Sequence, residues 1–104
     1  MLELNKDNFE QEVKQAEGYV LVDFWSQACE PCKALMPHVH AMEEEFPSVK
    51  FCSFDIATGR RVAIGEKVLG LPVIAIYKDG EQVYRVDKDE ASKESVREML
   101  EKAK

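Results

Sequence analysis

An apolar run from Tyr19 to Trp25 constrains the fold of this chain more than any other segment. Its residues are β-branched, aromatic or leucine, and Asp23 is the only charged residue among them. Strands of this composition occur in sheets that are covered by helices on both faces. The run therefore predicts a central strand of such a sheet, with Asp23 held away from solvent.

The other segments predict strands and helices in the order βαβαβαββα. Further strands are expected at residues 2–4, 49–55, 73–77 and 82–86. Helices are expected after Asn5 as far as Gly18, and over residues 32–45, 60–68 and 92–103. Strand–helix–strand units need parallel crossovers, and Asp79-Gly80 is typical of a hairpin turn. We therefore expect one α/β domain over residues 1–104, with a mixed five-stranded sheet flanked by four helices.

Two cysteines, Cys29 and Cys32, follow closely on the predicted central strand, with Glu30 and Pro31 between them. Unpaired amides at a helix N-terminus lower the pKa of a nearby thiol, and proline suits the first helical turn. Cys29, just ahead of the helix, is therefore expected to attack, and Cys32, inside the first turn, to resolve. A reversible dithiol in this place predicts electron exchange with the disulfides of other proteins.

A metal site is the first alternative for this pair. Zinc needs about four ligands, whereas the sequence has no second cysteine pair, and His38 and His40 lie further along the same predicted helix. Redox chemistry is therefore favoured over a metal site or inert cysteines, and no metal is expected. The third cysteine, Cys52, is expected to be a core residue, with a regulatory thiol as the alternative.

Charge and hydropathy limit the possible partners and location. The net charge of −6 argues against nucleic acid or an anionic membrane as the main partner. The N-terminus lacks a basic start followed by an apolar stretch, and apolar runs reach only about seven residues, too short for a membrane span. A close cysteine pair within an odd total of three fits a reducing compartment. We expect a soluble, monomeric, cytoplasmic protein.

Asp23 is the candidate general base. A buried carboxylate without a partner is costly, so its pKa is expected to rise. Such a group can take a proton near neutral pH, and its natural task is to deprotonate Cys32 through a water. The alternative is a polar strand residue that finds a hydrogen bond.

Five motifs resemble the thioredoxin family over essentially the whole chain, in the family's order and spacing. They are Val20–Trp25, Cys29-x-Pro31-Cys32-Lys33, Pro37, Gly70-Leu71-Pro72 and Lys78–Glu81. The resemblance implies the thioredoxin fold and a protein-disulfide reductase without a bound cofactor. It also implies Cys29 as nucleophile, Cys32 as resolving thiol, Asp23 as buried acid, and recycling by a thioredoxin reductase.

The resemblance also implies a docking surface for an extended segment of the target protein. Pro72 would follow a cis bond, pack against the disulfide and present backbone to the target. From the residues alone, a proline at this strand start is compatible with either isomer. The residues implied to line the groove are Trp25, Ala28, Gly70, Leu71, Pro72 and Val73.

Several positions depart from the common family pattern. Glycine is usual at Glu30, tryptophan at Ala28, threonine at Val73 and lysine at Phe51, and a usual glycine is missing near Asp87-Lys88. Glu30 and Pro31 are expected to tune the redox potential. Glu30 should disfavour a thiolate at Cys29 and make the protein a stronger reductant, while the absence of lysine at Phe51 should raise the pKa of Asp23 further.

Three atypical segments resemble one subgroup of the family. Ala34–Pro37, Lys67–Pro72 and Ile76–Gly80 look like thioredoxins of anaerobic, amino-acid-fermenting bacteria, which serve the selenium-dependent glycine reductase system. This makes that system a candidate among the disulfide-containing targets. Two alternatives stay open, namely an oxidant or isomerase on the same fold, and a binding module whose dithiol is incidental.

Overall fold

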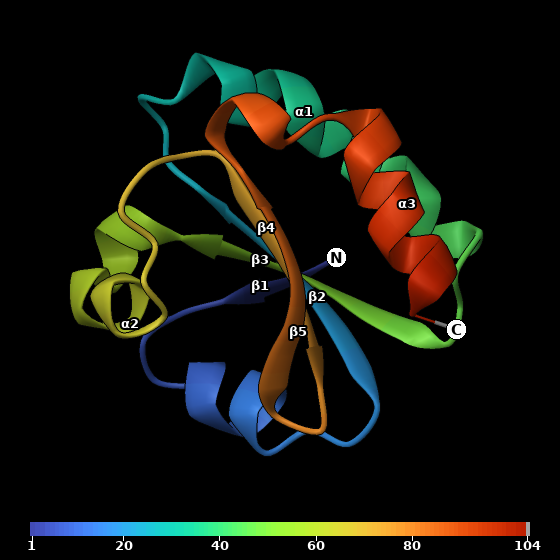
Figure 1. Cartoon of the computed structure of the whole chain (residues 1–104). Coiled ribbons are helices and arrows are strands. Elements are labelled where there is room, and N and C mark those ends of the chain that lie inside the picture. The colour runs from blue at the N-terminus through green and yellow to red at the C-terminus, as the bar shows by residue number, and fades with distance from the viewer. Residues whose placement is uncertain (104) are drawn as a thin grey trace.

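The computed structural model describes residues 1–103, in which a mixed sheet lies between two layers of helices (Figure 1). The strands are β1 (Leu2–Leu4), β2 (Tyr19–Trp25), β3 (Val49–Asp55), β4 (Val73–Lys78) and β5 (Glu81–Asp87). Their order across the sheet is β1-β3-β2-β4-β5. β3 pairs in parallel with β1 and β2, whereas β4 is antiparallel to β2 and to β5. The predicted five-stranded mixed sheet is confirmed for residues 1–103.

The helices of residues 1–103 are α1 (Glu30–Ala41), α2 (Arg60–Gly65), α3 (Lys93–Lys102) and a π-helical turn, Glu10–Lys14. Short 3-10 turns follow α1 at Met42–Glu44, β3 at Ile56–Thr58 and β5 at Lys88–Glu90. All four predicted helices differ in their bounds, α3 by only one residue at each end. The segment after Asn5 is a shorter π-helical turn, and α1 begins at Glu30 and ends before its 3-10 turn. α2 stops three residues early because Lys67 adopts a left-handed backbone with φ 61°.

Each face of the sheet carries its own apolar core. On one face, the β2 residues Val20, Val22 and Phe24 pack in a cluster with residues of the π-helical turn and α2. On the other face, Leu21 packs in a cluster with residues of α1 and α3. Figure 1 shows α1 and α3 together on one side of the sheet and α2 on the opposite side. The predicted burial of β2 on both faces is confirmed, because Val20 to Phe24 are all at most 1% exposed.

The hairpin between β4 and β5 follows from its two turn residues. Asp79 and Gly80 have left-handed backbones, with φ 51° and 87°, as a two-residue hairpin turn requires. A Cβ atom on Gly80 would lie 2.2 Å from the carbonyl oxygen of Lys14, so only glycine fits. The Asp79 carboxylate accepts a hydrogen bond of 2.8 Å from the amide of Gly18 and ties the hairpin to the start of β2.

Candidate active site

The two cysteines of the motif form a disulfide at the N-terminus of α1. Their sulfur atoms are bonded and their Cα atoms lie 5.3 Å apart. Cys29 is the N-cap of the helix, and its backbone is extended, with φ −92° and ψ 99°. The amide of Cys32 donates a hydrogen bond of 3.2 Å to the sulfur of Cys29. Because anions are stabilised at a helix N-terminus, this amide is placed to stabilise a thiolate on Cys29 after reduction.

The two sulfurs differ in accessibility. Cys29 is half-buried, whereas Cys32 is 1% exposed and points inward from α1. Cys32, Leu35 and Val39 are the buried residues of α1, and their spacing places them on one helix face, toward the sheet. A partner can therefore reach Cys29 directly, and Cys32 only after Cys29 has reacted.

Glu30 and Pro31 occupy the first turn of α1, where proline leaves no helical hydrogen bond unmade. The side chain of Glu30 is 82% exposed and forms an ion pair of 3.2 Å with Lys33, which is three residues further along the helix. The ammonium of Lys33 offsets the field of the Glu30 carboxylate at Cys29. Any influence of Glu30 on the thiolate is therefore smaller than an unpaired carboxylate would exert.

Asp23 lies in the middle of β2 and is 1% exposed. Its neighbours Val22 and Phe24 point to the opposite face, so Asp23 faces the same side of the sheet as α1. Within residues 1–103, neither carboxylate oxygen has a hydrogen-bond partner. Burial raises the pKa of Asp23 to about 7, which confirms the predicted rise. Phe51, where the family usually has lysine, is 2% exposed in the core on this face and supplies no charge.

The bond between Leu71 and Pro72 is cis, as the resemblance implied. The carbonyl oxygen of Pro72 accepts a hydrogen bond of 2.7 Å from the amide of Lys88. Lys88 has a left-handed backbone, with φ 54°. Its side chain lies against Gly70, where an added Cβ atom would come within 2.3 Å of the Lys88 Cε. The segment that follows β5 therefore contacts the loop before β4 through a backbone hydrogen bond and a side chain.

The residues expected to line a docking groove separate into two groups. Ala28 is exposed, and Trp25, Gly70 and Leu71 are half-buried. Val73, by contrast, is 0% exposed, because it begins β4 and pairs with Phe24 near the centre of the sheet. The Val73 side chain therefore lies in the core, and its place in the groove stays a prediction. Pro72 is also buried, directly before it.

Two residues near the site were not assigned a role from the sequence. Lys88 holds the Pro72 carbonyl, and the missing glycine at this point of the chain was the only signal for it. Ser53 lies beside Asp23 in the register of β2 and β3. A polar residue within an apolar strand was visible in the sequence, but its alignment with Asp23 depends on the pairing of strands about 30 residues apart.

No helix within residues 1–103 has both the length and the apolar character needed to cross a bilayer. The same residues contain no cluster of three or more histidine, cysteine or acidic side chains arranged to hold a metal ion.

Comparison with known proteins identifies the family. The family profile described as Thioredoxin matches residues 1–102. The thioredoxin of Acetoanaerobium sticklandii is 54% identical over 103 residues, covering 98% of both chains. The thioredoxin of Peptoclostridium acidaminophilum is 47% identical over 98% of this chain and 94% of the relative's length. The thioredoxin of Tissierella creatinophila is 75% identical over 44 residues, which are 42% of this chain and 100% of the relative's length. With its Cys29–Cys32 disulfide at the start of α1, the chain belongs to the thioredoxin family of thiol-disulfide oxidoreductases.

Proposed function

We propose that this protein reduces disulfides of other proteins in two steps, with Cys29 as nucleophile and Cys32 as resolving thiol. The carrying observation is the difference in exposure between the two sulfurs at the N-terminus of α1. The Cys29 thiolate attacks one sulfur of the target disulfide, the target bond breaks, and a mixed disulfide forms. Cys32 then attacks Cys29, which releases the second target sulfur as a thiolate and leaves the Cys29–Cys32 disulfide.

The first step depends on the thiolate of Cys29. The amide of Cys32 already points at the Cys29 sulfur, and the N-terminal dipole of α1 acts in the same direction. Both effects favour the charged form over the thiol. This explains why attack begins at Cys29 and not at Cys32, whose sulfur lies on the apolar face of the helix.

The second step needs a base, and we assign that role to Asp23. Its side chain faces the sheet surface on which α1 lies, and its pKa of about 7 lets the carboxylate and the acid coexist near neutral pH. A base with such a pKa accepts a proton from Cys32 without being permanently neutralised.

The docking surface consists of Trp25, Ala28 and the loop Gly70-Leu71-Pro72. Leu69, which precedes this loop, is 82% exposed, the highest value among the exposed large apolar residues of the described chain. An exposed apolar side chain directly before this loop favours apolar contact with a target segment. Pro72 and Val73 have buried side chains, so we assign them a part in this surface through their backbone atoms.

The partners follow from family membership, which implies a thioredoxin reductase as electron donor and disulfide-containing target proteins. We propose the glycine reductase system as one target. The sequence similarity to the thioredoxins of Acetoanaerobium sticklandii and Peptoclostridium acidaminophilum supports this choice. We further propose that the protein acts as a monomer in the cytoplasm, where thiols are kept reduced.

Reduction of insulin disulfides by wild type and by three serine variants tests the assignment of the cysteines. Cys29→Ser should abolish turnover and trap no target, whereas Cys32→Ser should abolish turnover but accumulate a mixed disulfide through Cys29. Cys52→Ser is the matched control and should keep wild-type activity, because Cys52 is a free, buried thiol. Turnover by Cys29→Ser would show that the dithiol is not the catalyst, and trapping by that variant would reverse the two roles.

A further inference from the structure

Asp23 and Ser53 are the buried polar residues of the described chain, and they are neighbours across the sheet. Asp23 of β2 pairs with Ser53 of β3, and Ser53 in turn pairs with Glu3 of β1. Paired residues on adjacent strands project to the same face, and the strands lie about 4.8 Å apart. Glu3, Ser53 and Asp23 therefore form a row from the edge of the sheet to its centre.

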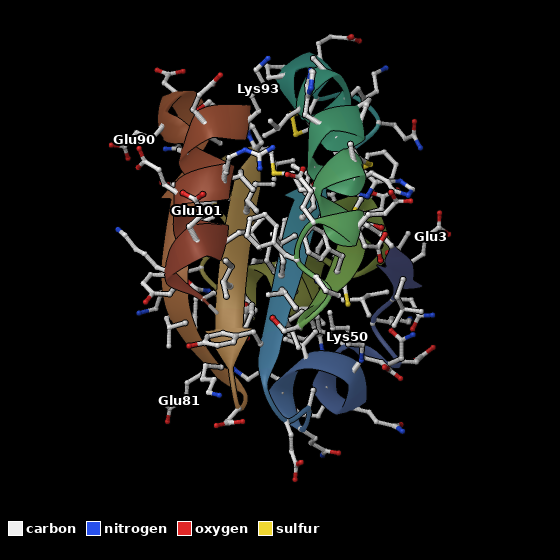
Figure 2. The ribbon with its side chains drawn as sticks, turned by 90° about the vertical axis from the view of Figure 1, so that its right-hand side faces the viewer. Glu3, Lys50, Glu81, Glu90, Lys93 and Glu101 are labelled. Atoms are coloured by element: carbon white, nitrogen blue, oxygen red, sulfur yellow. A yellow bond between two sulfur atoms is a disulfide. The ribbon has the colours of Figure 1, made fainter. Side chains whose placement is uncertain are left out.

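The outer end of this row is open to solvent. Ser53 lines a surface depression of about 400 Å³, whose wall also includes Glu3, Asp55 and Thr58. Figure 2 shows Glu3 pointing outward at the β1 edge of the molecule. Ser53 is 7% exposed and Asp23 is 1% exposed. Solvent in the depression thus reaches a residue one strand away from a carboxyl that solvent does not reach.

The other sides of Asp23 offer no such route. On β4 its partner is Ile74, which is apolar and 0% exposed. On the α1 side, Cys32 is the buried cysteine on the helix face toward the sheet and is the proposed proton donor. The charged groups on the side of the depression are Glu3 and Asp55, and the lining contains no basic residue. Ser53 is therefore the polar residue beside Asp23 on the side of the depression, and within residues 1–103 no hydrogen bond joins the two side chains.

We propose that Ser53 is the positioning residue through which Asp23 exchanges protons with solvent in the depression. This rests on the proposed role of Asp23 as base. Asp23 takes the proton of Cys32, and the Cys32 thiolate attacks Cys29, breaks its bond to the target and closes the Cys29–Cys32 disulfide. The target leaves as a thiolate, and the carboxylic acid passes its proton to a water held by the Ser53 hydroxyl and from there to solvent in the depression. Before the step, the same water donates to the otherwise unpartnered Asp23 carboxylate and keeps part of it charged, ready to act as base.

The two chemical steps can be followed separately with a symmetrical chromogenic aromatic disulfide as substrate of the reduced protein. The first release of aromatic thiolate reports attack by Cys29, and the second reports attack by Cys32. Ser53→Ala should slow the second release up to about fivefold below pH 7, because losing one water-mediated hydrogen bond raises the pKa of Asp23 and leaves less carboxylate to deprotonate Cys32. The first release should stay within about twofold of wild type. Ser53→Thr keeps a hydroxyl and should restore the second release.

Thr58→Ala is the matched control. It removes a hydroxyl from the wall of the same depression, but that hydroxyl donates to the carbonyl oxygen of Asp55 at 2.7 Å and is not in the row. Both releases should stay at the wild-type rate. As a readout independent of activity, NMR titration of the Asp23 carboxyl carbon in reduced protein should show a higher midpoint in Ser53→Ala, because the carboxylate loses hydration, and a wild-type midpoint in Ser53→Thr.

Asp23→Asn separates failure of this proposal from failure of the proposed function. If Asp23→Asn slows the second release and Ser53→Ala does not, the role of Ser53 is overturned and that of Asp23 stands. If Asp23→Asn leaves the second release unchanged, the role of Asp23 falls, and that of Ser53 falls with it. Equal slowing in Ser53→Ala and Thr58→Ala would also overturn the proposal, because any loss at the depression would then suffice.

Discussion

Two buried ionisable side chains, Tyr77 on β4 and Asp23 on β2, have opposite surroundings in this protein. Tyr77 is 0% exposed, and its hydroxyl donates to Glu66 at 2.6 Å and accepts from Gln82 at 3.3 Å. Asp23 is 1% exposed, and within residues 1–103 neither of its oxygens has a hydrogen-bond partner. Buried polar groups are nearly always bonded, so Tyr77 follows the rule and Asp23 breaks it.

The difference separates a structural polar group from a functional one. Burial and the hydrogen bond to Glu66 raise the pKa of Tyr77, so this residue stays neutral near pH 7. Burial alone brings the pKa of Asp23 to about 7, where small changes of environment alter its charge. Tyr77, near the hairpin, therefore keeps one protonation state near pH 7. Asp23, which precedes the disulfide in the chain, can change its protonation state there.

Removing the charge of Asp23 is expected to have the largest effect on stability. The pKa of its carboxyl rises from 3.8 to about 7 on folding, so the folded state binds the proton more tightly. Wild type should therefore lose stability as the pH rises from about 4 to 7, by about 4 kcal/mol in total, and Asp23→Asn should not. Denaturant unfolding of the oxidised proteins between pH 4 and 8 measures this. Parallel pH curves for the two proteins would contradict it.

Tyr77→Phe is expected to have an intermediate effect of a different kind. It removes the donor to Glu66 and the acceptor for Gln82, which should lower the free energy of unfolding by about 1 to 2 kcal/mol. Unlike Asp23→Asn, it should leave the slope of stability against pH below 7 unchanged. Tyr84→Phe on β5 is the control, since it leaves these two hydrogen bonds intact. Equal losses in both variants would count against a specific role of the Tyr77 hydroxyl.

The hairpin and the segment behind the docking loop each contain a left-handed backbone position, one held by glycine and one by lysine. Substitutions there are expected to have a smaller effect on stability. At the hairpin, φ 87° is held by Gly80, whereas behind the docking loop φ 54° is held by Lys88. Lys88→Gly should therefore raise stability by about 1 kcal/mol, and Gly80→Ala should lower it by more, because its Cβ would meet Lys14. Thermal unfolding of the two variants measures whether stability rises in Lys88→Gly and falls in Gly80→Ala. A destabilised Lys88→Gly would mean that packing of the lysine side chain on Gly70 outweighs the strain.

The smallest effect is expected at Glu30. Loss of its charge should stabilise the Cys29 thiolate and make the reduction potential less negative, but only by about 10 mV, because Glu30 is exposed and paired with Lys33. Glu30→Gln isolates the charge, and Glu30→Gly adds the backbone change. Equilibration of each variant with glutathione measures the potential. A shift to a more reducing value would show that Glu30 acts in the opposite direction.

Much of the fold could be predicted because its signals are local. The composition of Tyr19–Trp25 indicated a strand buried on both faces, and Asp79-Gly80 indicated the hairpin turn, both of which the structure contains. Helix ends were predicted less well. α2 ends at Gly65 because Lys67 adopts a left-handed backbone, a conformation for which lysine carries no signal.

The residues of the candidate site were also predicted well where the signal is local and less well where it depends on strand pairing. The cysteine pair and the buried acid were found from the sequence, since each depends on residues close together in the chain. The burial of the Val73 side chain was not predicted, because it results from pairing with Phe24 on another strand. Ser53 was not assigned a role, because only the register of β2 and β3 places it beside Asp23.

By itself, the sequence determined the central strand, the cysteine pair at the start of α1 and the acid that precedes them. These depend on side-chain polarity and on backbone preferences that act over a few residues. Only the tertiary structure decided that Lys88 holds the Pro72 carbonyl and that Glu3, Ser53 and Asp23 form one row. Such contacts join residues far apart in the chain, and strand register and core packing bring them together.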